Sequence, residues 1–150
     1  MKIQYNVLDI NELKFVHQIL GQDKWGFGYT STDYEKPIWN FNKQAGKEIA
    51  ELLSSKFDGT LLDWHINGQT YQLPGSPHID SADGCTKSVV YFPFDWKFEW
   101  GGRLNIFDVK GINIITPEKN LGVIFDSHLT HYAEAPVINK LRVSIGLKLK

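Results

Sequence analysis

The spacing of apolar residues changes near residue 60 and divides the chain into two parts. Before that point apolar positions recur every three or four residues, and after it they alternate along short segments. The first part predicts helices and connecting loops, and the second predicts β-strands joined by turns that contain Gly or Pro. We expect a single domain over residues 1–150, with helical support and a loop over 1–59 and a β core over 60–150.

Two helices are expected in the first part. Asn11 can cap a helix whose apolar residues lie on one face and which ends at Gly21. A second helix fits residues 41–57, again by its apolar spacing. The segment from Trp25 to Trp39 is rich in Gly, Ser, Thr and aromatic residues, and is expected to be an irregular loop. Its aromatic side chains would either line a substrate pocket or form a flap packed on the sheet.

The second part predicts a series of short strands. Asn67-Gly68 separates two alternating segments, and this pair tolerates the positive φ angles of a hairpin turn. His65, just before it, is expected to be an ordinary strand residue. Further strands are expected at residues 87–92, 103–107, 112–115, 121–125 and 141–149. The fold class that follows is mainly β with flanking N-terminal helices, as a sandwich or as a double-stranded β-helix (jelly roll).

Composition limits the class of protein. The net charge is -1 and there is no basic run, so extended binding to DNA or RNA, which needs clustered Lys and Arg, is not expected. The single cysteine, Cys85, allows no internal disulfide, indicates a reducing interior and is expected to have no catalytic role. The N-terminal segment has no long apolar run, so we expect no signal peptide, no membrane span and a cytoplasmic protein.

His78 and Asp80 are the first candidate metal ligands. They follow Pro74-Gly75-Ser76-Pro77, and residues two apart in an extended segment point the same way, so an imidazole and a carboxylate can meet at one point. A third ligand must come from elsewhere in the chain, and His128 and His131 directly follow an expected strand. Two histidines and one carboxylate with open coordination positions suit a non-haem Fe(II) that activates oxygen.

A candidate anion site lies on the last expected strand. Arg142 and Ser144 are two residues apart and therefore point the same way. A guanidinium group can place two parallel hydrogen bonds on a carboxylate, and a hydroxyl group can add a third. Otherwise Arg142 would be a solvent-facing residue paired with a protein carboxylate, which contributes little to stability.

Taken in order, these pieces resemble the 2-oxoglutarate/Fe(II)-dependent dioxygenase superfamily, and within it the prolyl-4-hydroxylase-like branch. The matching pieces are His78-x-Asp80, Trp100-Gly101-Gly102-Arg103-Leu104, Phe125-Asp126-Ser127-x3-His131 and Arg142-Val143-Ser144. The resemblance covers roughly residues 60 to 150 and suggests a compact member of that branch.

The resemblance implies that His78, Asp80 and His131 are the iron ligands. His131 is preferred to His128 because it lies at the family's interval from the Phe-Asp-Ser motif. It also precedes Arg142 by 11 residues, which is close to the usual gap.

The resemblance also implies a set of contacts to 2-oxoglutarate. Arg142, assisted by Ser144, would pair with the far carboxylate of the co-substrate. Tyr91 lies where relatives often place a hydroxyl group on the same carboxylate. Tyr71 would contact the co-substrate from the preceding strand, although its spacing to His78 is shorter than in that branch.

The activity implied is an Fe(II)- and 2-oxoglutarate-dependent dioxygenase (a hydroxylase). It would hydroxylate a peptidyl proline, a free amino acid or another small molecule and release succinate and CO2. Its co-substrate would be O2, and ascorbate would serve as reductant. Asp80 favours hydroxylation because halogenating relatives lack this carboxylate, whereas desaturation and ring formation stay open.

Two other classes of protein are weighed against this one. A non-catalytic jelly-roll module that binds a ligand would be expected to have lost its metal ligands, whereas this sequence has the full set. A cupin-type metal enzyme would use O2 without 2-oxoglutarate, with more histidines in a tighter cluster, and would need no arginine on the last strand.

Overall fold

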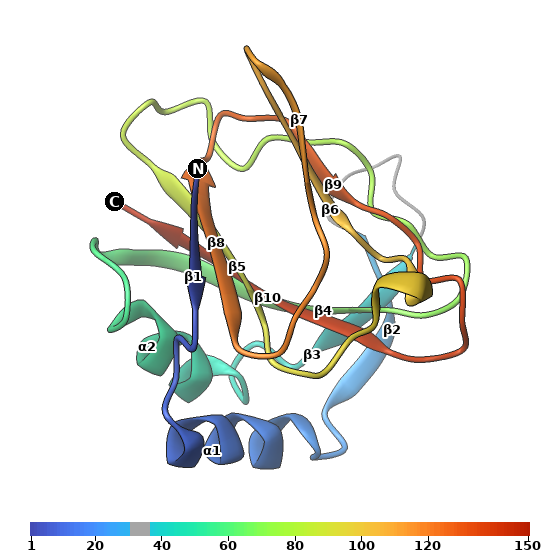
Figure 1. Ribbon diagram of the computed structural model, residues 1–150. Coiled ribbons are helices and arrows are strands. Elements are labelled where there is room, and N and C mark those ends of the chain that lie inside the picture. The colour runs from blue at the N-terminus through green and yellow to red at the C-terminus, as the bar shows by residue number, and fades with distance from the viewer. Residues whose placement is uncertain (31–36) are drawn as a thin grey trace.

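The computed structural model describes residues 1–30 and 37–150, which form two antiparallel β-sheets and two helices (Figure 1). The elements are β1 (Lys2–Tyr5), α1 (Ile10–Leu20), β2 (Trp25–Tyr29), β3 (Ile38–Phe41), α2 (Lys47–Ser54), β4 (Leu61–Gln69), β5 (Lys87–Phe92), a 3-10 turn (Phe98–Trp100), β6 (Leu104–Asp108), β7 (Gly111–Ile115), β8 (Leu121–Asp126), β9 (His131–Ala133) and β10 (Arg142–Leu149).

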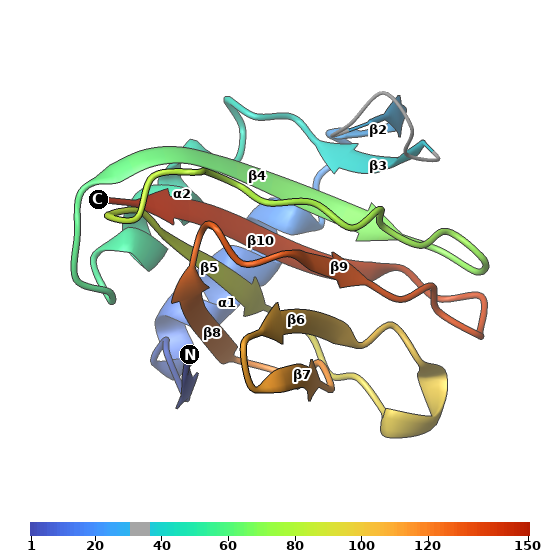
Figure 2. The ribbon, with the colours of Figure 1, turned by 90° about the horizontal axis from the view of Figure 1, so that it is seen from above.

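The larger sheet has the strand order β1-β8-β5-β10-β4-β3-β2, and the smaller sheet has the order β7-β6-β9. Figure 2 shows the smaller sheet on the face of the larger sheet that points away from the helices. The mainly β prediction is confirmed, and two facing antiparallel sheets are consistent with a jelly roll. The five strands expected from residue 87 onward lie within one residue of their predicted bounds.

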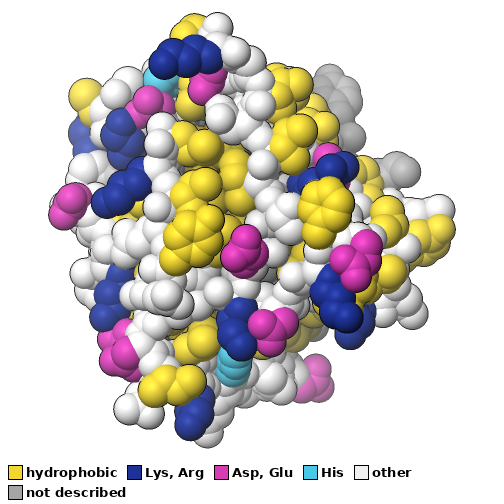
Figure 3. Space-filling view, viewed as in Figure 1, with side chains coloured by type: hydrophobic (Ala, Val, Ile, Leu, Met, Phe, Trp, Pro, Cys, Tyr) yellow, Lys and Arg dark blue, Asp and Glu magenta, His cyan; other side chains and the backbone are white. Residues whose placement is uncertain are grey.

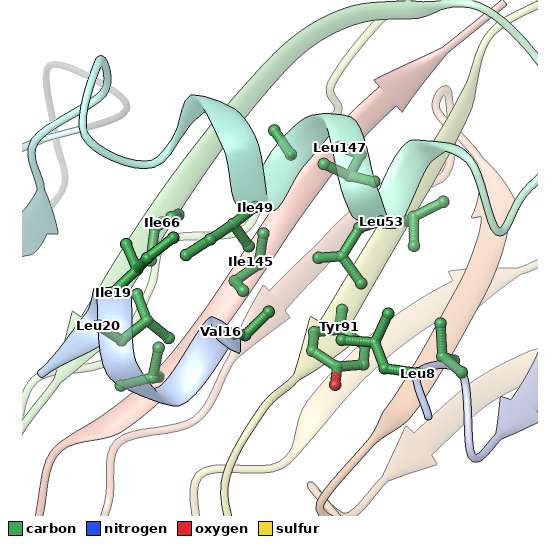
Figure 4. Close-up of a cluster of buried hydrophobic side chains, with 14 of the residues drawn as sticks. Leu8, Val16, Ile19, Leu20, Ile49, Leu53, Ile66, Tyr91, Ile145 and Leu147 are labelled. Atoms are coloured by element: carbon green, nitrogen blue, oxygen red, sulfur yellow. The ribbon is translucent and has the colours of Figure 1, made fainter. Parts of the chain in front are cut away.

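Both helices cover the larger sheet and close the main hydrophobic core. Val16 and Ile19 of α1 and Ile49 and Leu53 of α2 are buried in one cluster with apolar residues of β4, β5 and β10 (Figure 4). Burial of this kind supplies most of the stability of short helices. No helix in the described residues is long and apolar enough to cross a membrane.

The helix bounds differ from the prediction at both helices. Asp9, and not Asn11, caps α1, because its carboxylate accepts from the backbone N–H of Glu12 at 2.9 Å while the Glu12 carboxylate accepts from the backbone N–H of Asp9. This capping box satisfies two amide groups that would otherwise lack partners. The second helix is confined to Lys47–Ser54, since Phe41 belongs to β3.

The segment Trp25–Trp39 was expected to be an irregular loop, and its described ends instead form strands. β2 pairs with β3, and β3 pairs with β4, so this segment extends the larger sheet. Backbone pairing with β4 outweighs the weak strand preference of a Gly-rich sequence. Tyr34, one of the aromatic residues considered there, lies outside the described residues. β1 was likewise not expected.

The hairpin predicted at Asn67-Gly68 is wrong. β4 runs without a turn from Leu61 to Gln69, and Gly68 pairs with Val143 of β10. The glycine is needed for close packing and not for a positive φ angle. A Cβ atom at Gly68 would lie 2.7 Å from Leu141 Cδ1 and 3.1 Å from Trp25 Cζ3.

We expect Gly68→Ala to lower the free energy of unfolding by about 1–3 kcal/mol, because the added methyl group forces neighbouring side chains apart. Urea denaturation would measure the change. Gly26→Ala is the matched control, since no atom lies within 4 Å of a Cβ atom built there. Equal stability of the two variants would contradict this account of β4.

The face of the molecule drawn in Figure 3 has no large patch of positive or of negative side chains. Lys and Arg side chains lie among Asp and Glu side chains across that face.

Candidate metal centre and its cavity

Three side chains converge at the end of the smaller sheet. His78 and Asp80 lie between β4 and β5, and His131 begins β9. Their nearest ligand atoms all lie within 4.8 Å of one another. Asp80 Oδ1 is 3.5 Å from His78 Nε2, and Asp80 Oδ2 is 3.6 Å from His131 Nε2. These separations are close to those of atoms that share one ion at about 2.1 Å, so the set could hold a metal ion.

Backbone hydrogen bonds bring the ligand segments together. The backbone N–H of His78 donates to the carbonyl of His131 at 3.1 Å, and the N–H of His131 donates back at 2.9 Å. The N–H of Asp80 donates to the carbonyl of Ser127 at 3.0 Å. Residues some 50 positions apart are thereby fixed in register, as in a short piece of sheet.

Each imidazole is oriented by a backbone carbonyl group. His78 Nδ1 lies 2.8 Å from the carbonyl of Ser76, and His131 Nδ1 lies 3.1 Å from the carbonyl of Leu129. A carbonyl group only accepts, so Nδ1 carries the proton and Nε2 presents its lone pair toward Asp80. This is the arrangement that metal-binding histidines adopt.

The surroundings of Asp80 keep its carboxyl group ionised. Burial opposes ionisation, but the two neighbouring imidazoles, when protonated, and the hydroxyl group of Ser88 outweigh it and hold the pKa of Asp80 well below its usual range. Ser88 Oγ donates to Asp80 Oδ2 at 2.5 Å and lies 2.8 Å from Ser127 Oγ. Burial also lowers the pKa of His131, which favours the neutral imidazole that a metal requires.

Arg142 is a buried cation whose hydrogen bonds are incomplete. Its Nε donates to the carbonyl of Gly102 at 2.6 Å, and Nη1 donates to Gln69 Oε1 at 2.9 Å and to Ser144 Oγ at 3.3 Å. Nη2 is buried without a partner among the described residues. Burial lowers the pKa of Arg142 to about 10, against the attraction of Glu134, so the side chain stays charged near neutral pH.

One cavity of about 310 Å³ connects the three candidate ligands with Arg142 and Ser144. Its wall on β4 is polar. The residues of that wall are Asp63, His65, Asn67 and Gln69. The candidate metal ligands and the Arg142 side chain therefore line the same cavity.

No protein-family model matches the sequence, and no curated protein matches it. Solved structures do. The chain is similar to a prolyl-4-hydroxylase from Pseudomonas putida, with a TM-score of 0.69, 16% identity, and 99% of this chain and 92% of that chain covered. The chain has the fold of the 2-oxoglutarate/Fe(II) oxygenases.

Two further structures with this oxygenase fold differ in what they bind. A prolyl hydroxylase from Trichoplax adhaerens, in complex with a peptide of hypoxia inducible factor, has a TM-score of 0.73 and 18% identity, with 99% of this chain and 82% of that chain covered. The epimerase SnoN of nogalamycin biosynthesis, in complex with Fe3+, α-ketoglutarate and nogalamycin RO, has a TM-score of 0.66 and 12% identity, with 99% and 78% covered.

The structure separates the residues selected from the sequence into two groups. Those that line the cavity are His78, Asp80, His131, Arg142 and Ser144. His128 is exposed and is not among the residues that line the cavity. Tyr71 is an exposed turn residue after β4 and is not among the residues that line the cavity.

Tyr91 does not face the cavity, in contrast to the expectation. Its neighbour Val90 lines the cavity, and alternate residues of a strand point to opposite faces of a sheet. Tyr91 is therefore buried beneath the helices (Figure 4). Its hydroxyl group donates to Asn120 Oδ1 at 2.9 Å. Burial raises the pKa of Tyr91 well above its usual range.

Sequence reasoning missed His65 and Gln69 as cavity residues. The sequence pattern that could have identified them is the two-residue alternation of side chains along β4. This alternation places Gln69, Asn67 and His65 on one face of the strand. The supposed turn at Asn67-Gly68 interrupted that period and hid it.

We expect Ser88→Ala to weaken metal binding about tenfold or more, because removal of a group that orients a ligand usually has an effect of this size. Titration with Co(II), followed by its visible absorption, would measure the affinity. Ser127→Ala should have a smaller effect, since the Ser127 hydroxyl group touches Ser88 and not the Asp80 carboxylate. Wild-type affinity in Ser88→Ala would show that this contact does not orient the ligand.

Proposed function

We propose that this protein is an Fe(II)- and 2-oxoglutarate-dependent dioxygenase that hydroxylates a small molecule, a free amino acid or a peptidyl proline and releases succinate and CO2. The observation that carries the proposal is the buried Arg142, whose Nη2 has no partner in the described structure, in one cavity with a His-Asp-His set. The structural neighbours with this fold support the same reading.

The donor set fits Fe(II). His78 and His131 would each bind through Nε2, and Asp80 through one carboxylate oxygen. Two histidines and one carboxylate form the donor set of non-haem Fe(II) sites that keep positions open for other ligands, and all three residues line the cavity. Bound there, the metal would supply the activation of O2, which no protein side chain can provide.

Arg142 fits the far carboxylate of 2-oxoglutarate. Gly102 and Gln69 hold the guanidinium group in place, and Nη2 is the N–H donor that has no partner among the described residues. Ser144 Oγ lies beside Nη1 and can donate to the same carboxylate. An anion here would complete the hydrogen bonds of a cation that otherwise lies buried with an unsatisfied donor.

The size and chemistry of the cavity bear on the alternatives. A volume of about 310 Å³ is at the low end for small-molecule sites, which supports a small substrate or a single residue of a peptide as the reacting group. A cupin-type reaction without 2-oxoglutarate, or a module without a metal, would leave either Arg142 or the ligand set without a role.

We expect His131→Ala to lose tight Fe(II) or Co(II) binding, because it removes one of three protein ligands. His128→Ala is the matched control, since His128 is exposed on the same segment. Isothermal titration with each metal under anaerobic conditions would measure both. Equal metal affinity in the two variants would exclude His131 as a ligand.

We expect Arg142→Gln to weaken 2-oxoglutarate binding by about tenfold to a hundredfold, which corresponds to the loss of one charge-assisted hydrogen bond. The visible absorption band of the anaerobic Fe(II) complex would report binding. Succinate formation with Fe(II), ascorbate and O2 would report turnover. Arg103→Gln is the control, since Arg103 pairs with Glu134 and does not line the cavity. If wild type bound Fe(II) but not 2-oxoglutarate, the proposed activity would be wrong.

A further inference from the structure

Two side chains in the cavity have no role in the proposed metal and co-substrate sites. They are His65 of β4 and Lys148 of β10. Neither has a hydrogen bond or an ion pair with another described residue. The nearby carboxylate of Asp63, by contrast, is occupied by an ion pair with Lys43. The cavity therefore contains two polar groups with unused hydrogen-bonding capacity.

The pairing of β4 with β10 places these two side chains next to each other. Lys148 lies opposite Asp63, and His65 lies opposite Gly146, so His65 and Lys148 are diagonal neighbours on one face of the sheet. Long side chains at such positions can reach a common ligand. The imidazole lies directly over Gly146, because a Cβ atom there would be 2.3 Å from His65 Nε2. The missing side chain makes room for the ring.

The pairing of β5 with β10 places Lys148 at the metal end of the cavity. Lys148 lies opposite Ser88, and Ser88 donates to the candidate ligand Asp80. Arg142 lies at the other end of the same strand. A ligand held by Lys148 would therefore lie near the metal and away from the far carboxylate of 2-oxoglutarate, which is where the second substrate must be.

The balance of charge in the cavity indicates the sign of that ligand. The charges of Fe(II) and Arg142 would be matched by those of Asp80 and of the two carboxylates of 2-oxoglutarate. Asp63 and Lys43 match each other. Among the described residues Lys148 then leaves one positive charge over, and a partly buried charge gains stability from a partner of opposite charge.

We propose that Lys148 and His65 bind an oxyanion of the substrate, so that the substrate is a small acid carrying a carboxylate or a phosphate group. Lys148 supplies the charge and up to three N–H donors, and the imidazole of His65 supplies one more. A free amino or hydroxy acid has such a group, whereas a proline inside a peptide has none. This inference rests on the proposed function and narrows its substrate class.

The test uses the full chain loaded with Fe(II) and 2-oxoglutarate without oxygen. Three sets of probes are added: L-amino acids, the primary amides of the same amino acids, and glycerol phosphate with glycerol as its neutral partner. A shift in the visible absorption band reports binding beside the metal, and succinate formation in air reports productive binding. The variants are Lys148→Gln, Lys148→Arg and His65→Gln. Lys110→Gln, an exposed residue in the turn between β6 and β7, is the matched control.

We expect an anionic probe to bind wild type more tightly than its neutral partner. Lys148→Gln should weaken that binding by about tenfold to a hundredfold, as expected when a charged hydrogen bond is lost. His65→Gln should weaken it to a smaller degree, Lys148→Arg should retain it, and Lys110→Gln should match wild type. A response to amino acids would identify a carboxylate, and a response to glycerol phosphate alone would identify a phosphate.

Two results would overturn the inference: no anion that binds better than its neutral partner, or Lys148→Gln with wild-type affinity for the anion. Either result could arise in a protein that binds Fe(II) and 2-oxoglutarate normally, and the proposed function would then stand. Failure of wild type to bind Fe(II) and 2-oxoglutarate at all would instead overturn the proposed function.

Discussion

The two backbone hydrogen bonds between His78 and His131 are the constraint on which the site depends. They join the segment after β4 to the first residue of β9, so that one edge of the smaller sheet is tied to a connection from the larger sheet. Backbone groups of a buried segment must be paired, and these pairs satisfy that need while they fix the distance between the two imidazoles. The third candidate ligand, Asp80, is positioned by a similar bond from its backbone N–H to the carbonyl of Ser127. The geometry of the candidate ligands thus depends on backbone hydrogen bonds of the fold.

The register of β10 determines both which of its side chains pack in the hydrophobic core and which line the cavity. Its apolar residues Val143, Ile145, Leu147 and Leu149 belong to the core beneath the helices, and its alternate residues Arg142, Ser144 and Lys148 line the cavity. A slip of one residue would exchange the two faces and bury charge among apolar side chains. Burial of the core face therefore holds Arg142 and Lys148 near opposite ends of the strand that lines the cavity.

The features of this structure that could be predicted are those that depend on the pattern of a few neighbouring residues in the sequence. The alternation along β10 and the two-residue spacing of His78 and Asp80 give strand bounds and ligand direction directly. Features decided by distant contacts were not predictable. Gly68 resembles a turn residue until Trp25 and Leu141 are seen packed against it, and Tyr91 is one residue out of phase with the cavity. Strand existence follows from local pattern, whereas the face that a strand buries depends on its partners.

Several polar groups of the cavity have hydrogen-bonding capacity that a bound ligand could satisfy. A buried guanidinium group with a free N–H lowers the stability of the protein by itself, and the partly buried side chains of His65 and Lys148 have no hydrogen-bond partner among the described residues. Evenly packed interiors avoid such groups, and here they lie together in one cavity and not at separate points of the core. A ligand that completes their hydrogen bonds would regain that free energy and would stabilise the folded chain in proportion to its concentration. These donors are therefore what would give the proposed site its preference for anions.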